Sequence, residues 1–279
     1  MSIRWSDRQI ETGTEDLLAR VEDGVAYLVM NRPERRNALS AAMLKGLEVA
    51  LADAERSSDV GCVVLTGAGG AFCAGGDVKA MAERHAGAGP KLSLDERIHA
   101  QRLSQRNTAG RLYQMPKPTI AALPGAAAGA GLALAMACDL RIASEAAILT
   151  TAFAKVGFSG DYGGTFFMTR LIGSAKAREL YFLSERIDAK HAERLGLVNR
   201  VVASLALEDE TATLATRLAN GPTVAFRYMK ENLNRAAASG MQECLDLEAT
   251  HHVHSGLTED HRNAVAAFVE KREPSFRGR

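Results

Sequence analysis

Apolar and polar positions over the first two-thirds of the chain follow two kinds of pattern. Short apolar runs closed by turn residues predict strands at 24–32, 61–67 and 117–125, then in DLRIAS and AILTTAF. Segments with helical spacing lie between the strands, at 41–56, 77–113, 126–138, 162–172 and 174–184. Ser40 is the expected N-cap of the first helix, and AGAGP interrupts the 77–113 segment with an expected mobile loop. This alternation predicts an α/β core.

The last part of the chain has a different pattern. LGLVNRVV is expected to end in a strand, and only helices follow it, at 207–220, 223–238, 241–254 and 258–270. The change near residue 203 predicts an α/β core over residues 1–203 and a helical region over residues 204–279.

Charge and cysteine spacing exclude several classes of protein. The 34 basic and 33 acidic residues give a net charge of +1, so no overall field attracts nucleic acid or a membrane surface. The polar first residues predict no secretion signal. Widely spaced cysteines without a CxxC motif predict free thiols in a cytoplasmic protein. His251, His252 and His254 match no metal motif, so no metal is expected.

Two familiar glycine motifs are also excluded by spacing. In a dinucleotide-binding motif, Phe72 and Leu134 would each have to be the third glycine. In GFSGD, Asp161 stands where a nucleophile elbow has its last glycine. The glycine-rich turns therefore need another explanation.

Both glycine-rich turns follow a predicted strand and lead into a predicted helix. They are AFCAGGDVK, residues 71–79, and PGAAAGAGLALA, residues 124–135. Small residues allow close approach of a ligand to the backbone, and helix N-termini present free N–H groups that suit an oxyanion. Tight packing explains either turn alone, but the two together predict a pair of converging N–H donors, an oxyanion hole.

These turns, with NRPERRNAL, ACDLRIAS, GFSGDYGGT, LGLVNRVV and AAFVEKREPSF, resemble the enoyl-CoA hydratase/isomerase family, or crotonase superfamily. The resemblance covers nearly the whole chain. It implies a crotonase-like spiral of ββα units with a C-terminal helical region for trimerisation, as a homotrimer or dimer of trimers. It also implies an acyl-CoA substrate whose coenzyme A is part of the substrate, so that no separate cofactor is needed.

The resemblance assigns site residues position by position. Gly76 and Ala130 fall on the oxyanion donors, and Ala74 on a backbone contact to adenine. The remaining substrate-binding positions are Arg35 or Arg36, Ala38, Asp77, Phe153, Phe268 and Lys271. The arginines would supply charge for the CoA phosphates. Phe268 and Lys271 would touch CoA, sometimes from a neighbouring subunit, or else belong to a helix face packed on the core.

The chain departs from the resemblance at both glutamates that hydratases use. Ala133 and Phe153 occupy these positions, and neither side chain transfers a proton. Asp161 remains, at a position that the resemblance associates with a proton-transfer base in double-bond isomerases and with the nucleophile of aromatic dehalogenases. An N-cap role for Asp161 is the alternative.

The expected reaction is therefore a shift of an enoyl-CoA double bond through an enolate, with Asp161 as acid and base. Two readings stay open beside it: a hydratase or lyase with a different acid, and a CoA-ester-binding protein without activity. The dehalogenase reading is weaker, since no histidine aligns with that family's base. A second polar participant remains to be chosen among Tyr162, Ser159, Tyr113 and Glu83. Acyl specificity stays open, although Phe153, Phe158, Phe166 and Phe167 suggest a wide or aromatic-tolerant pocket.

Overall fold

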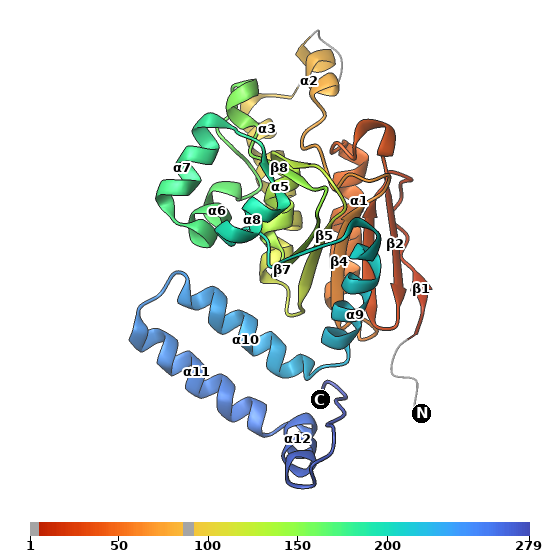
Figure 1. Ribbon diagram of the computed structural model, residues 1–279, viewed down its shortest axis with the longest axis vertical. Helices are drawn as coiled ribbons and strands as arrows, with labels where there is room; N and C mark the ends of the chain where they lie inside the picture. The colour runs from red at the N-terminus through yellow and green to blue at the C-terminus, as the bar shows by residue number, and fades with distance from the viewer. Residues whose placement is uncertain (1–5, 86–91) are drawn as a thin grey trace.

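The computed structural model describes residues 6–85 and 92–279, and its core is a seven-stranded sheet (Figure 1). The spatial order is β1-β2-β3-β4-β5-β7-β10. These strands are β1 Arg8–Gln9, β2 Leu17–Glu22, β3 Val25–Met30, β4 Cys62–Gly67, β5 Thr119–Leu123, β7 Leu140–Ser144 and β10 Arg200–Val202. β1 to β3 pair antiparallel, and the pairs from β3 to β10 are parallel.

The central strands β4, β5 and β7 are buried along most of their length because both faces of the sheet are covered. In β4, Val63 and Leu65 join the main core, which includes helix α1 (Ala41–Arg56), while Val64 faces the opposite cluster. Helix α9 (Leu207–Ala219) completes that second cluster. Successive residues of one strand thus serve two cores, as the two-residue side-chain period requires.

A second, smaller sheet lies beside the first and carries the helices next to the site. Its strands are β6 Ala127–Ala128, β8 Ile148–Thr150 and β9 Ile187–Asp188. The associated helices are α5 Ala130–Ala137, α6 Gly164–Ile172, α7 Ser174–Leu183 and α8 Ala189–Leu195, with a 3₁₀ turn over Phe153–Val156. α5 is buried along its whole length, and it packs against α6.

Several predicted elements are confirmed, with α1 and its Ser40 cap the clearest: the Ser40 hydroxyl accepts the Met43 N–H at 2.9 Å. The predicted 77–113 segment consists of α2 Val78–His85, α3 Leu94–Gln105, a π-helical turn Arg106–Gly110 and α4 Arg111–Gln114. The loop expected at AGAGP lies outside the described residues.

Two predicted helix starts are wrong. The helix expected over 126–138 begins only at Ala130, because Ala127 pairs with Leu149 as part of β6. The helix expected over 162–172 begins at Gly164, since Tyr162 and Gly163 have left-handed φ angles of 47° and 75°. Left-handed residues do not continue a right-handed helix.

The hairpin of β2 and β3 and helix α8 are not among the predicted elements. The hairpin had a readable signal in Asp23-Gly24, both left-handed with φ of 49° and 78°. An Asp-Gly pair between alternating runs is typical of a two-residue hairpin turn.

The C-terminal helices separate into two groups. α9 packs on the sheet, whereas α10 Thr223–Ala236, α11 Met241–Gly256 and α12 Glu259–Val269 extend away from it (Figure 1). The division of the chain at residues 203–204 stays a prediction. None of the described helices is both long and apolar enough to cross a membrane.

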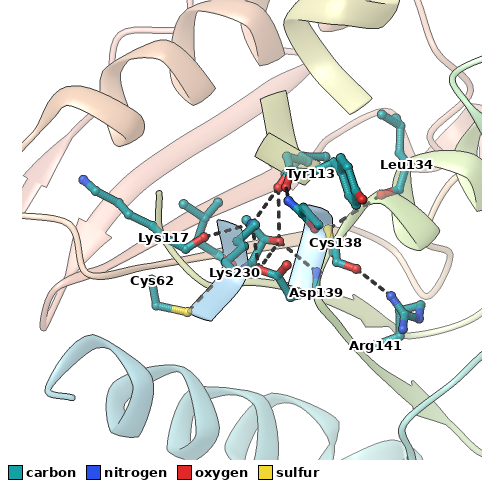
Figure 2. Close-up of polar contacts among 12 residues, drawn as sticks. Cys62, Tyr113, Lys117, Leu134, Cys138, Asp139, Arg141 and Lys230 are labelled. Atoms are coloured by element: carbon teal, nitrogen blue, oxygen red, sulfur yellow. Dashed lines mark hydrogen bonds and ion pairs between the residues drawn. The ribbon is translucent and has the colours of Figure 1, made fainter. Parts of the chain in front are cut away.

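A buried lysine joins α10 to the core (Figure 2). The Lys230 ammonium group donates to the carbonyls of Leu112 and Lys117 at 2.9 and 3.1 Å and to the Asp139 carboxylate at 2.8 Å. The three donors of the ammonium group are thereby all satisfied, although its side chain is only 8% exposed. Asp139 in turn accepts the Thr119 N–H at 2.8 Å, which ties the joint to the start of β5.

Candidate active site

The structure brings the two glycine-rich turns into direct contact. The Cys73 N–H donates to the Ala126 carbonyl at 3.0 Å, and the Cys73 carbonyl accepts the Ala128 N–H at 2.9 Å. The approach is so close that a Cβ on Gly131 would lie 2.5 Å from the Cys73 carbonyl oxygen. Only glycine fits at that position, so the small residues serve the packing of the two turns as well as access to a ligand.

The two expected oxyanion donors lie beside each other. Gly75 has φ of 91°, and a Cβ there would lie 3.5 Å from the Ala130 nitrogen. The N–H of Gly76 follows directly, next to the N-terminus of α5. Within the described residues, neither Gly76 nor Ala130 donates its N–H to a protein acceptor. Both groups are therefore free to bind an oxyanion.

An arginine that the sequence analysis does not single out fixes the first turn. The Arg32 guanidinium donates to the Asp77 carboxylate at 3.1 Å and to the Ala38 carbonyl at 2.7 Å. Asp77 also accepts the Ala80 N–H at 3.1 Å near the start of α2. That backbone hydrogen bond, helped by Arg32, holds the pKa of Asp77 below its ordinary value. The Asp77 carboxylate is thus committed to the geometry of the turn.

Residues expected near the CoA phosphates gather at the same turn. Arg35 and Arg36 are exposed, and the Arg36 carbonyl accepts the Ala74 N–H at 2.9 Å. Ala38 is buried just beyond them. Their arrangement depends on Asn37, whose buried side chain donates to the Ala71 carbonyl at 2.8 Å. The signal for Asn37 in the sequence is weak, because an asparagine in a turn is common.

Phe268 and Lys271 lie elsewhere in the fold. Phe268 belongs to α12, at the opposite end of the molecule from α2, which begins two residues after Gly76 (Figure 1). Its side chain is 85% exposed, and Lys271 is exposed as well. Packing of this helix face on the core of its own chain is therefore wrong for Phe268. Within one chain, the structure does not bring these two residues to the site.

Asp161 does not cap a helix, so that alternative is wrong. The N-cap of α6 is Gly163, and no side chain caps this helix. The Asp161 Oδ1 atom is buried and has no hydrogen-bond partner among the described residues. Burial raises the pKa of Asp161 from 3.8 to about 6. A carboxyl group tuned toward neutrality in this way suits proton transfer.

Apolar side chains occupy both positions at which the resemblance places glutamates. Ala133 is fully buried in α5, one turn beyond Ala130. Phe153 is 7% exposed, and a Cβ on Gly129 would lie 3.8 Å from its ring edge. The structure therefore places Phe153 at the entrance to α5, beside the oxyanion turn, where it contributes an apolar wall.

Tyr181 of α7 is a polar residue near the site that the sequence analysis misses. Its ring stacks on Phe153 with centroids 5.8 Å apart. A Cβ on Gly164 would lie 2.4 Å from the Tyr181 hydroxyl oxygen and 3.2 Å from the Ala133 Cβ. The hydroxyl therefore lies close to Ala133. Burial, and then the charge of Asp161, raise the pKa of Tyr181.

The four polar candidates named from the sequence have other surroundings. The Tyr162 hydroxyl lies 3.2 Å from the Ser104 hydroxyl, and the Tyr162 N–H donates to Gln105 at 2.9 Å. Tyr113 packs edge-on against Phe166. Ser159 and Glu83 are exposed. No residue pattern pointed to Tyr181, because α7 reaches the site only through its packing on the 3₁₀ turn and α6.

The sequence profile described as enoyl-CoA hydratase/isomerase matches residues 20–279 of this chain. The chain belongs to the enoyl-CoA hydratase/isomerase family. It is 37% identical over 266 residues to the 1,2-epoxyphenylacetyl-CoA isomerase of Escherichia coli, covering 95% of this chain and 99% of that protein. It is 33% identical to the short-chain-enoyl-CoA hydratase of Clostridium acetobutylicum, covering 92% and 96% of the two chains.

Solved structures of the enoyl-CoA hydratase/isomerase family confirm the expected fold class. The crystal structure of an enoyl-CoA hydratase from Bacillus anthracis has a TM-score of 0.86 at 32% identity, and the match covers 95% of this chain and 100% of that one. A Geobacillus kaustophilus structure of the same family has a TM-score of 0.86 at 36% identity, with 95% and 98% covered. The α/β spiral with C-terminal helices is thus shown, and the chain is an acyl-CoA enzyme of this family.

Proposed function

We propose that this enzyme moves the double bond of an enoyl-CoA thioester, with Asp161 carrying the proton. The observation that supports this function best is the buried Oδ1 atom of Asp161, which has no protein partner in the described chain. A carboxylate is retained there at the cost of its desolvation, as is usual at catalytic sites. Ala133 and Phe153 are apolar, and the Asp77 carboxylate is already paired with Arg32 and the Ala80 N–H, so we assign the proton transfer to Asp161.

In this mechanism, the thioester carbonyl oxygen accepts hydrogen bonds from the N–H groups of Gly76 and Ala130. The Asp161 carboxylate takes a proton from C2 of a 3-enoyl ester, and the electron pair moves into a dienolate whose oxyanion the two N–H groups stabilise. The protonated Asp161 then returns the proton to C4, which leaves the double bond between C2 and C3. The same carboxyl group takes and gives the proton, so no second acid is required.

The environment of Asp161 matches both halves of this cycle. With its pKa raised to about 6, the carboxyl group is mostly ionised at pH 7 and accepts a proton readily. Because its pKa is raised, it is also a stronger base than an ordinary aspartate, and a pKa near the working pH favours efficient proton transfer. The CoA phosphates are bound elsewhere in this proposal. Exposed Arg35 and Arg36 lie beside the turn that leads to Gly76, and they supply positive charge for the phosphates.

The test is a deuterium-exchange assay with 3-hexenoyl-CoA and 2-hexenoyl-CoA in deuterated water, followed by mass spectrometry. The wild-type enzyme is expected to interconvert the esters with deuterium uptake. Asp161→Asn should slow this by about 10²- to 10⁴-fold, the usual worth of a general acid–base group. Asp209→Asn, an exposed position in α9, is the matched control and should change nothing.

Other outcomes identify the alternatives. Accumulation of 3-hydroxyhexanoyl-CoA would establish a hydratase, the activity named for the Clostridium acetobutylicum relative. Binding of both esters without any exchange would establish a protein that has lost catalysis. Equal rates for wild type and Asp161→Asn would remove Asp161 from the mechanism.

We propose further that the chains assemble as a trimer or a dimer of trimers in the cytoplasm. The supporting observation is the set of large apolar side chains exposed on the C-terminal helices, including Met229, Leu233, Leu245, Val253, Leu257 and Phe268. Monomeric proteins seldom expose so much apolar surface in one region. Sedimentation of the purified protein tests this assembly.

A further inference from the structure

The Tyr181 hydroxyl combines three properties that its packing alone does not require. It lies near Ala133 and Gly164, it belongs to α7, which is outside the glycine-rich turns, and among the described residues the hydrogen bond at Tyr181 goes to its backbone carbonyl and none to its hydroxyl. Its ring is fixed by the stacking on Phe153, with an interplanar angle of 13°. A rigid ring with an unused donor at its tip is suited to recognition of a ligand atom.

The position of Tyr181 relative to the oxyanion donors follows from α5. Ala130 and Ala133 are three residues apart and share a face of this helix, about 4.5 Å apart along its axis. An acyl chain that extended along α5 from a carbonyl bound at Ala130 would reach the region of Ala133 after three or four carbon–carbon bonds of about 1.5 Å. The Tyr181 hydroxyl lies near that stretch of the chain.

A purely hydrocarbon acyl group is a poor match for this arrangement. It would displace water from the Tyr181 hydroxyl and offer no acceptor in return, and an unpaired buried hydroxyl is costly. Burial keeps the phenol protonated, so the group acts as a hydrogen-bond donor. The nearby carboxyl group of Asp161 has its own role in the proposed proton transfer and is itself unpaired.

We propose that Tyr181 selects acyl-CoA substrates that carry an oxygen acceptor on the fourth or fifth carbon of the acyl chain, with the Tyr181 hydroxyl donating to that oxygen. The inference rests on the proposed function in one respect: it requires the thioester carbonyl to bind at Gly76 and Ala130, so that the acyl chain extends along α5. It does not depend on whether the enzyme then isomerises, hydrates or only binds the ester.

The experiment measures binding of esters that cannot undergo the proposed reaction. Pentanoyl-CoA, 4-oxopentanoyl-CoA and 5-oxopentanoyl-CoA are titrated calorimetrically into the full-length wild-type enzyme and into Tyr181→Phe. An oxo group accepts hydrogen bonds but donates none, so it cannot pair with the Asp161 carboxylate. Phenylalanine keeps the ring stacked on Phe153 and removes only the hydroxyl.

One of the two oxo esters is expected to bind about tenfold more tightly than pentanoyl-CoA to wild type, the worth of one well-placed hydrogen bond. Tyr181→Phe should bind all three esters alike. Tyr162→Phe is the matched control, because the Tyr162 hydroxyl already lies within hydrogen-bond distance of Ser104. It should keep the preference for the oxo ester.

Three results would overturn the inference. They are equal binding of all three esters to wild type, a preference that survives in Tyr181→Phe, and a preference lost in Tyr162→Phe instead. If none of the esters binds, acyl-CoA recognition fails together with this inference. If all bind equally while deuterium exchange proceeds, only the role of Tyr181 fails.

Discussion

The two glycine-rich turns and the C-terminal helices of this enzyme differ in how much of their apolar surface is buried. Around Gly76 and Ala130 the chain is built of small residues, and α5 is enclosed over its whole length. Along α10 to α12 large apolar side chains face outward, among them Leu233 at 72% and Phe268 at 85% exposure. One region is enclosed by side chains of the same chain, and the other exposes large apolar side chains.

The contrast shows how the two regions depend on side chains. The proposed oxyanion donors, the N–H groups of Gly76 and Ala130, are backbone groups fixed by packing, so other side chains at positions 133 and 153 would leave them in place. The attachment of α10 relies on the ammonium group of Lys230 and its three acceptors. Chemistry at the site can therefore change by a few side chains while the oxyanion hole persists, whereas one substitution can weaken the joint.

Among the variants that test this comparison of the two regions, the largest effect is expected from Ala130→Pro. Proline is accepted at the first position of a helix, but its ring carbon replaces the N–H hydrogen. The variant therefore removes one oxyanion donor and places a methylene group where that donor points, without breaking α5. The rate constant for deuterium exchange should fall by about 10²- to 10³-fold. Glu259→Pro at the first position of α12 is the control, and its rate should equal that of wild type. A normal rate in Ala130→Pro would show that this N–H does not bind the oxyanion.

Lys230→Met tests the joint. It leaves the Asp139 carboxylate and two carbonyls without their cation, and breaking a buried pair on one side costs about 3–5 kcal/mol of unfolding free energy. Urea unfolding measures this loss. Arg235→Met, which removes a half-exposed ion pair with Glu243, should cost less than about 1 kcal/mol. Equal losses in the two variants would contradict the special role of Lys230.

The pH dependence separates the chemistry of the site from its stability. Asp161 must be ionised to accept a proton, so kcat/KM should rise about tenfold per pH unit up to the pKa of about 6 and then level off. The free energy of unfolding, in contrast, should fall as pH rises over the same range. The raised folded-state pKa contributes stability that is fully present below the unfolded value of 3.8 and is lost as pH rises through about 6.

Rates and thermal unfolding measured from pH 4 to 8 test both slopes. Asp161→Asn should lack the rate inflection and should gain stability relative to wild type as pH rises from 4 to 6. A wild-type rate that instead falls as pH rises through 6 would mean that the protonated carboxyl group is the active form.

The smallest effect on the isolated chain is expected from Leu233→Glu. The side chain is 72% exposed, so unfolding free energy should change by less than about 0.5 kcal/mol. Assembly should nevertheless weaken, as sedimentation at several protein concentrations would show. Leu18→Glu, at a 50% exposed position in β2 and outside the C-terminal helical region, should leave assembly unchanged. Unchanged assembly in Leu233→Glu would place the interface on another surface.

Local signals in the sequence predicted the parts of the fold that local interactions determine. Ser40 ahead of an apolar helical pattern correctly gave α1, because the cap and the helix are contiguous in the chain. The start of α5 was placed too early, since the pairing of Ala127 with Leu149 depends on a strand from elsewhere in the chain. Pairing across such a separation leaves no periodicity in residues 126–129 for a local pattern to reveal.

Some candidate site residues could be predicted and others could not. The small residues after two strands predicted two turns with close backbone approach, and the resemblance assigned Gly76 and Ala130 within them as the N–H donors. Asp161 was predicted through the resemblance. Whether its carboxyl group caps a helix or stays unpaired could be decided only from the left-handed backbone of Tyr162 and Gly163, which delays the start of α6. Arg32 and Tyr181 were missed because each acts on a segment distant in sequence.

The sequence by itself determined the family, the α/β class and the two turns that carry the N–H donors, because these depend on residue size and order along the chain. Tertiary structure decided which polar groups remain without partners near those donors. The pairing state of Asp161 and the position of Tyr181 depend on how α5, α6 and α7 pack around Ala133. Desolvation and hydrogen-bond satisfaction are properties of that three-dimensional packing, and they set the chemistry of this site.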